Sequence, residues 1–173
     1  MEEIFILRHA EAEDLSEDSA ITDFDRKLTE DGIKKTNKLG LLFNNLKEDV
    51  NLILSSPYVR AKETASIFAA TLEPKTEVKT VDFLRVGSSV KEIAKGLMPY
   101  TNLKKIVLVG HAPDLGIFIG KLIGAERIKL KKGAMAKVKL NNNFELSGEL
   151  NWLITPKIIN KFKIKQDKLT TAL

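Results

Sequence analysis

Three short runs of apolar residues place the strongest constraint on how this chain folds. They are residues 4–7 (IFIL), 52–54 (LIL) and 106–109 (IVLV), and each is followed by polar residues and then by a helical pattern. Continuous apolar runs of this length are typical of strands that are buried on both faces of a parallel sheet. The alternation of such strands with helices predicts an α/β fold, in which helices cover both faces of a mainly parallel central sheet.

Four helices are predicted from signals that mark where a helix begins. The signals are Thr29 for a helix over about 30–46, Ser56-Pro57 for a second helix, a capping box of Ser89 and Glu92 for a third that runs to about Met98, and Pro113 for a fourth. In the first of these helices we expect one apolar side, formed by Ile33, Leu39, Leu42, Phe43 and Leu46.

The last quarter of the chain shows a different pattern. Residues 134–140 and 149–154 read as two strands, separated by a turn signal of asparagines at 141–143. Together they predict an antiparallel hairpin at one edge of the sheet. We expect its lysines to face solvent, where they would protect the edge from aggregation. Residues 161–165 read as a short strand or a basic tail.

The composition excludes several classes of protein. Apolar residues make up 43% and charged residues 29% of 173 residues, which is ordinary for one globular domain. The absence of cysteine excludes disulfides, thiolate catalysis and cysteine zinc sites. No apolar run approaches the roughly 18 residues of a membrane span, and the start Met1-Glu2-Glu3 lacks the basic charge of a signal peptide. We expect a single domain over residues 1–173, with 160–173 as a candidate basic tail, in a soluble, cytoplasmic monomer.

The two histidines of the chain, His9 and His111, occupy equivalent places. Each lies just beyond the carboxyl end of a predicted strand. Ligands of open α/β sheets bind at the carboxyl ends of the strands. We therefore predict that both histidines lie at the same edge of the sheet and serve a function there.

Three arginines are predicted at that edge. Arg8 adjoins His9, Arg26 precedes the helix that begins after Thr29, and Arg60 lies in the first turn of the helix after Ser56. Guanidinium groups match the geometry of phosphate oxygens and stay charged at any working pH. The sequence thus predicts an oxyanion site, with phosphate as the favoured ligand. Arg8 and His9 can share a ligand only if the strand ends at them, because successive strand residues point to opposite faces.

Four motifs in order resemble the histidine phosphatase superfamily, which has the phosphoglycerate mutase-like fold. Residues 7–11 (LRHAE) resemble its Arg-His-Gly signature, and residues 28–32 (LTEDG) its Leu-Thr-x-x-Gly element. Residues 55–65 (SSPYVRAKETA) match its Ser-Pro-x-x-Arg-Ala-x-x-Thr motif, and residues 109–111 (VGH) its third motif. The short length and residues 150–156 (LNWLITP) resemble the SixA-type phosphohistidine phosphatases of that superfamily.

The resemblance implies a three-layer α/β fold and a phosphoryl transfer in two steps, without a metal or another cofactor. His9 would attack phosphorus and become a phosphohistidine, which water then hydrolyses. Arg8, Arg60 and His111 would hold the phosphoryl oxygens, with Arg26 as a fourth contact. Imidazole suits this role because it is both a nucleophile and a fair leaving group.

The general acid of the superfamily has no clear counterpart in this chain. Mutases and phosphomonoesterases of the superfamily carry a glutamate after the second motif, but residues 81–88 (VDFLRVGS) contain none. Asp82 and Glu11 are the acids that could replace it. An alkoxide leaving group needs a proton, whereas imidazole, with a pKa of roughly 6.5, leaves with little help. The sequence therefore favours a phosphohistidine-bearing protein, such as a signalling or phosphotransfer domain, as the substrate.

Other functions are compatible with parts of the sequence. His9, Glu11, His111 and Asp114 could be combined into a metal site, although the arginines argue against a cation there. The same fold could act on small phosphate esters, or bind phosphate without turnover. Residues 121–173 hold 12 basic and 4 acidic residues, but they lack the aromatic residues interleaved with basic ones that mark nucleic-acid binding. We expect no metal, membrane or nucleic acid among the partners.

Overall fold

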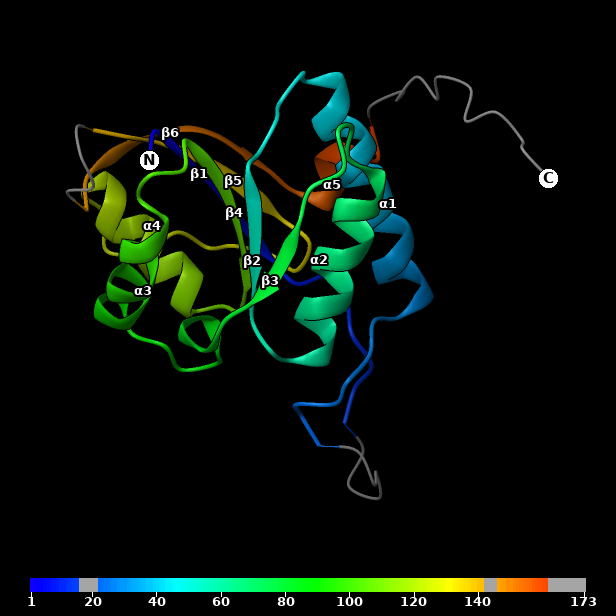
Figure 1. The fold of residues 1–173 in the computed structure, drawn as a ribbon. Helices are drawn as coiled ribbons and strands as arrows, with labels where there is room; N and C mark the ends of the chain where they lie inside the picture. Colours follow the sequence, from blue (N-terminus) through cyan, green and yellow to red (C-terminus); the bar gives the residue numbers. More distant parts are fainter. Residues whose placement is uncertain (16–21, 142–145, 162–173) are drawn as a thin grey trace.

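A six-stranded sheet with the order β3-β2-β4-β1-β5-β6 forms the centre of the structure, a computed structural model that describes residues 1–15, 22–141 and 146–161 (Figure 1). The parallel strands are β1 (Glu3–Arg8), β2 (Leu52–Ser55), β3 (Val78–Thr80) and β4 (Lys105–Gly110). Strand β5 (Met135–Leu140) runs antiparallel to β1, and β6 (Gly148–Ile154) runs antiparallel to β5.

The predicted fold class is confirmed. The three apolar runs form β1, β2 and β4, which are adjacent in the sheet, and the hairpin β5-β6 lies at one edge. Strand β3 at the other edge was not predicted, because it has only three residues and two of them are exposed. Such a strand carries no long apolar run by which it could be identified.

Helices cover both faces of the sheet, which gives three layers (Figure 1). Helices α1 (Glu30–Asn45), α2 (Val59–Thr71) and α5 (Pro156–Ile159) lie on one side, and α3 (Val90–Leu97) and α4 (Asp114–Ile123) on the other. Short 3-10 turns at Asp82–Leu84 (η1) and Met98–Tyr100 (η2) flank α3. Alternate residues of β1 feed the two layers, since Phe5 packs with α1 and α2 while Ile6 packs with α3 and α4.

Two predicted helix caps are confirmed. The Thr29 side chain accepts a hydrogen bond from Gly32 N at 3.1 Å at the start of α1. The capping box of Ser89 and Glu92 opens α3. Each cap satisfies amide groups that would otherwise lack a partner in the first turn.

The predicted apolar side of α1 is confirmed for Leu39, Leu42 and Phe43, which are buried, but not for the other two residues. Ile33 is 39% exposed and Leu46 is 46% exposed, so neither belongs to the core. The helix instead turns Gly32 toward the backbone of Glu11, so closely that a Cβ at this position would lie 2.3 Å from Glu11 O. This approach rotates Ile33 away from the interior. Leu46 lies at the helix end, where no layer covers it.

The start of α2 was also predicted wrongly. The helix begins at Val59, with extended backbone at Tyr58, so Ser56 is not its N-cap and Pro57 is not its first residue. The Ser56 hydroxyl has another partner, His111 Nε2, at 2.8 Å. The hydroxyl of Ser56 thus bonds a side chain that follows β4 instead of capping the helix next to it.

The lysines of the hairpin follow the prediction only in part. Lys139 is exposed, but the side chain of Lys137 is only 12% exposed and forms ion pairs with Glu48 at 2.8 Å and Glu3 at 3.1 Å. The expectation that Lys137 faces solvent was therefore wrong. Residues 142–143 of the predicted turn and 162–165 of the predicted strand or tail lie outside the described residues.

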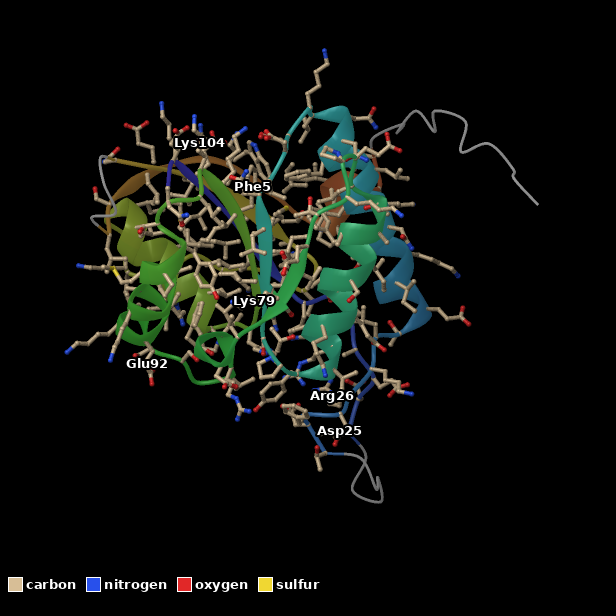
Figure 2. All side chains as sticks on the ribbon, in the orientation of Figure 1. Phe5, Asp25, Arg26, Lys79, Glu92 and Lys104 are labelled. Carbon is tan, nitrogen blue, oxygen red and sulfur yellow. The ribbon has the colours of Figure 1, made fainter. Side chains whose placement is uncertain are left out.

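Within the described ranges, no helix reaches the length and apolar character that crossing a membrane requires. The carboxyl ends of β1, β2 and β4 converge at one end of the sheet. Figure 2 shows Asp25 and Arg26 at this end, Lys104 at the opposite end and Phe5 in the interior. This convergence positions the candidate site.

Candidate active site

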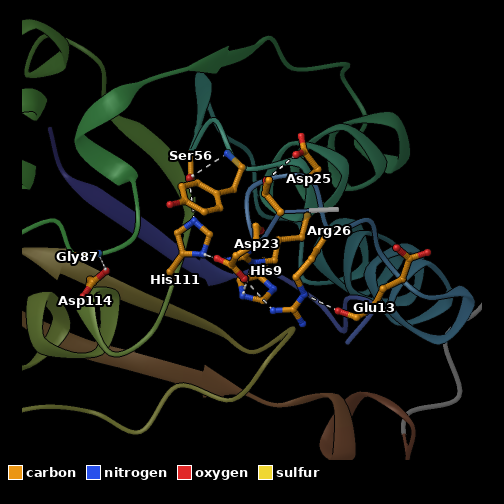
Figure 3. A network of polar contacts seen from close by, with 12 residues as sticks. His9, Glu13, Asp23, Asp25, Arg26, Ser56, Gly87, His111 and Asp114 are labelled. Atoms are coloured by element: carbon orange, nitrogen blue, oxygen red, sulfur yellow. Dashed lines mark hydrogen bonds and ion pairs between the residues drawn. The ribbon is translucent and has the colours of Figure 1, made fainter. Parts of the chain in front are cut away.

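His9 and His111 come together at the carboxyl edge of the sheet. Strands β1 and β4 are parallel neighbours with Arg8 opposite Gly110, so the residue after each strand lies beside its counterpart. The two ring centroids are 5.2 Å apart, and the residues are only 5% and 3% exposed. Residues 102 positions apart therefore share one buried site (Figure 3).

The Arg60 guanidinium links the two imidazole rings. Arg60 lies in the first turn of α2 and is 4% exposed. Its Nε donates to His9 Nε2 at 3.3 Å, and its Nη2 donates to His111 Nδ1 at 3.4 Å. Both bonds are long and therefore weak, so an incoming group can replace them at low cost.

The hydrogen-bond partners assign the protons of both rings. His9 Nδ1 lies 2.8 Å from the carbonyl oxygen of Ala10, which can only accept, so Nδ1 carries the proton and Nε2 has a free lone pair. In His111, Nδ1 accepts from Arg60, so Nε2 carries the proton that is donated to Ser56 Oγ. The His9 lone pair and the His111 lone pair thus both face Arg60.

Burial and positive charge keep both rings neutral. Burial, together with the charges of Arg60, Arg8 and Lys132, lowers the pKa of His9 to about 4, despite the opposing hydrogen bond to Ala10. Burial and the neighbouring His9 and Arg60 lower the pKa of His111 to about 3, against the opposing charge of Asp23. At neutral pH His9 therefore presents an unprotonated nitrogen to its surroundings.

Arg8 is the last residue of β1. The strand therefore ends between Arg8 and His9, which is the condition under which both side chains can reach one ligand. Its Nη1 donates to Leu130 O at 3.0 Å. Its Nε is buried and has no hydrogen-bond partner within the described residues. A buried N–H without a partner is costly, and an oxyanion at the site would satisfy it.

Asp23 belongs to the site and was missed by the sequence analysis. Its Oδ2 pairs with Arg60 Nη2 at 3.1 Å, its Oδ1 pairs with Arg26 Nη1 at 3.0 Å, and its carbonyl oxygen also accepts from Arg60 (Figure 3). Partial burial raises the pKa of the Asp23 carboxyl, but the two arginines outweigh this effect and hold that pKa below its usual range. Asp23 is therefore an ionised bridge between two arginines.

Arg26 is not bonded to either histidine in the part of the chain that the structure covers. Its guanidinium is held by Asp23, by the backbone oxygen of Glu13 and, at 3.8 Å, by Asp14. The structure thus brings Arg26 to the site through Asp23. It does not place Arg26 against His9 as it does Arg60.

A polar and aromatic wall lines the His111 side of the site. Besides the bond from His111, Ser56 Oγ accepts from Tyr58 N at 3.4 Å. The Tyr58 ring meets the His111 ring edge-on at a centroid distance of 4.9 Å, and Phe24 lies 4.9 Å from Tyr58. Ser56 was expected only as a helix cap, and neither Tyr58 nor Phe24 was predicted to line the site.

The acids that the sequence suggested as a general acid or metal ligand are bonded to partners outside the site. Glu11 pairs with Lys35 at 3.2 Å, and Asp82 pairs with Arg85 at 2.9 Å. Asp114 accepts from the backbone of Gly87 at 2.7 Å. The alternative metal site of His9, Glu11, His111 and Asp114 is therefore not assembled. Within the described residues, no group of three or more potential ligands is placed to hold a metal ion.

The arrangement has a clear chemical capacity. A neutral, buried imidazole with a free lone pair lies among arginines, next to an arginine N–H that has no partner among the described residues. Such a site can attract an oxyanion and present a nucleophile to its central atom. Thr64 links the two sides of the site, since its Oγ1 accepts a hydrogen bond from Ala10 N at 3.1 Å and donates one to Arg60 O at 2.7 Å.

Comparison with known proteins leads to the same chemistry. Residues 4–85 match the model of the histidine phosphatase superfamily (branch 1). The phosphohistidine phosphatase SixA of Escherichia coli (strain K12) is 24% identical over 158 residues, which cover 89% of this chain and 94% of that protein. This relative matches nearly the whole length of both chains.

Two solved structures show the shared fold. The protein histidine phosphatase SixA complexed with tungstate matches with a TM-score of 0.79 and 24% identity, over 90% of this chain and 97% of that one. A phosphoserine phosphatase mutant from Entamoeba histolytica, in complex with phosphoserine, matches with a TM-score of 0.67 and 17% identity, over 91% and 99%. The predicted phosphoglycerate mutase-like architecture is confirmed.

Proposed function

We infer the substrate of this chain from the leaving group that its site can release. The chain belongs to the histidine phosphatase superfamily and is a phosphatase. The proposed substrate is a phosphohistidine side chain of a partner protein. The proposed products are unmodified histidine and inorganic phosphate. The relative named phosphohistidine phosphatase SixA supports this choice.

One observation carries the choice of substrate. Within the described residues, the carboxylate bonded into the site is Asp23, and two arginines hold it in the ionised form. An ionised carboxylate cannot donate a proton to an alkoxide, which an ester of an alcohol would release. The imidazole of a phosphohistidine has a pKa of roughly 6.5 and leaves without such a donor. The site therefore suits a phosphorus–nitrogen bond.

The proposed reaction has two displacements at phosphorus. His9 Nε2 donates its lone pair to phosphorus, while the bond from phosphorus to the substrate nitrogen breaks and leaves its electron pair on the substrate imidazole. The reacting phosphohistidine carries a proton from solvent on its other ring nitrogen, so a neutral imidazole departs. Water then attacks the phosphoryl group on His9, releases a proton to solvent and frees inorganic phosphate. The hydrogen bond from His9 Nδ1–H to Ala10 O fixes the orientation of the ring, so that Nε2 faces the substrate in both steps.

The phosphoryl oxygens would be held by Arg8, Arg60 and His111. The partnerless Nε of Arg8 and the weak bonds of Arg60 to the two rings are the donors that an incoming phosphoryl group can use. Arg26, which shares the Asp23 carboxylate with Arg60, is proposed as a fourth contact. These charges stabilise the transition state without a metal ion.

A comparison of substrates with different leaving groups tests the proposal. Turnover of a phosphohistidine-bearing phosphotransfer domain, an aryl phosphate and an alkyl phosphate is measured with a chelator near neutral pH. Because general acids contribute about 100- to 10,000-fold, we expect kcat/KM for the alkyl phosphate to be at least about 100-fold below that for the phosphohistidine protein. The aryl phosphate should fall between them.

His9→Ala should abolish both turnover and the covalent phosphoenzyme, and Arg60→Ala should lower kcat by about 100-fold or more. Alkyl phosphates that are turned over faster than the phosphohistidine protein would refute the proposed substrate. That result would indicate a hidden acid and a small phosphate ester as the natural substrate. Near-normal turnover by His9→Ala would refute the mechanism.

A further inference from the structure

Residues 130–134, which lead from α4 into β5, are fastened to the nucleophile and its neighbour. Arg8 Nη1 donates to Leu130 O at 3.0 Å, and Arg8 N donates to Ala134 O at 3.1 Å. Gly133 N donates to the carbonyl oxygen of His9 at 3.0 Å. Both ends of the segment are therefore fixed relative to the site.

A tight turn within this segment carries Lys132 at its tip. Ala134 N donates to Lys131 O at 2.9 Å and closes the turn, and Gly133 has φ +68°, a conformation that glycine adopts without strain. Lys132 precedes this glycine and is half-buried, whereas the neighbouring Lys129 and Lys131 are exposed. The turn thus places Lys132, a half-buried lysine, one residue before the glycine that is bonded to His9.

Among the residues that the structure describes, no acid pairs with the ammonium group of Lys132. Other half-buried lysines of the chain pair with carboxylates, such as Lys35 with Asp31 and Lys137 with Glu48. No ion pair or hydrogen bond joins the Lys132 side chain to any residue that the structure describes. Its charge nevertheless reaches His9, because it contributes to the low pKa of that imidazole.

We propose that Lys132 is a further phosphoryl-binding residue, whose ammonium group contacts a non-bridging oxygen of the phosphoryl group at His9. This proposal rests on the proposed function, since it assigns another contact within the same site. The lysine comes from a segment that contains none of the four motifs, so no sequence pattern selects it. A flexible lysine at the end of a fixed turn can follow the oxygen from substrate to phosphoenzyme, which the planar arginines do less readily.

Binding of inorganic phosphate tests this contact independently of turnover. The two histidine ring signals in an NMR spectrum report occupancy of the site, because the chain has two histidines. Lys132→Met removes the charge and keeps the apolar stem of the side chain. Lys129→Met is the matched control, with the same change of net charge on an exposed residue of the same connection. Circular dichroism confirms that both variants are folded.

We expect Lys132→Met to weaken phosphate binding about tenfold or more, since it removes a charge-assisted hydrogen bond. Lys129→Met should change the affinity less than about twofold, and Lys132→Arg should retain most of it. The pKa of His9 should rise in Lys132→Met and stay unchanged in Lys129→Met. Equal effects of the two methionine variants would mean that only the overall field acts, and would overturn the proposal.

The outcomes separate this contact from the proposed substrate. Unchanged phosphate affinity in Lys132→Met, with slower turnover of the phosphohistidine protein alone, would place Lys132 against the partner protein and refute phosphoryl binding. Weaker phosphate binding in Lys132→Met, in an enzyme that prefers alkyl phosphates, would retain the contact and refute only the proposed substrate.

Discussion

Lowering the pH from about 7 to about 5 should leave His9 mostly neutral, although an ordinary histidine would be protonated. The pKa of His9 is lowered to about 4 by burial and by the nearby cations. At about pH 5 such a ring is roughly 90% neutral, whereas a ring with the usual pKa of roughly 6.5 is only about 3% neutral. The structure therefore predicts about a 30-fold larger share of reactive imidazole at this pH than an exposed histidine would have.

A titration of the ring signals measures this directly. The chain contains two histidines, and His111→Asn identifies the signal of His9. We expect a midpoint near 4 for His9 and one near 3 for His111 in the unsubstituted protein. Arg60→Met removes a repelling charge from beside both rings and should raise both midpoints. Because burial is the largest cause of the shifts, both should stay below the usual value.

A His9 midpoint at or above about 6.5 would refute the argument that burial and cations keep the nucleophile neutral. The same titration with phosphate bound should give a higher midpoint for each ring, because the anion favours the protonated forms. A shift in the opposite direction would mean that phosphate binds elsewhere.

Three further predictions concern the surrounding residues. Asp23→Asn should lower the turnover of alkyl phosphates and of the phosphohistidine protein by similar factors. Asp82→Asn, at an exposed acid, is the control and should not change either turnover. A loss of turnover for the alkyl phosphate alone would identify Asp23 as a general acid. Ser56→Ala leaves the Nε2 proton of His111 without its buried partner and should lower the free energy of unfolding by about 1–3 kcal/mol in urea titrations; a loss below about 0.5 kcal/mol would contradict that bond. The third prediction concerns acid stability: as the pH falls from about 6.5 to about 4, His9 is protonated in the unfolded chain before it is protonated in the native protein. The free energy of unfolding should therefore drop by about 3 kcal/mol more in the unsubstituted protein than in His9→Ala. Equal pH profiles of the two proteins would refute this linkage.

The layers of the fold could be predicted because they depend on local patterns. Continuous apolar runs identify β1, β2 and β4, and the caps at Thr29 and Ser89 act over three residues. Features that depend on distant contacts could not be predicted. Ser56 resembles a cap in sequence, but its hydroxyl is bonded to a histidine 55 residues away.

In the candidate site, too, the residues placed by local patterns could be predicted and those placed by tertiary contacts could not. The position of His9 and His111 follows from strand ends, and that of Arg60 from the first turn of a helix. Asp23 and Lys132 could not be selected, since they lie in loops with other charged residues and nothing local distinguishes them. Their place is fixed by tertiary bonds, from Arg60 and Arg26 to Asp23 and from Gly133 to His9.

The position of β1 inside the sheet has a consequence for the order in which this protein can be completed. During synthesis β1 is made first, yet its neighbours in the sheet are β4 and β5, which begin at Lys105 and Met135. An apolar strand must therefore wait for about 100 residues before either partner exists, and loop closure over that distance slows pairing. A nascent chain can thus complete its phosphatase site only after β4, which follows β1 by about 100 residues, has been synthesised.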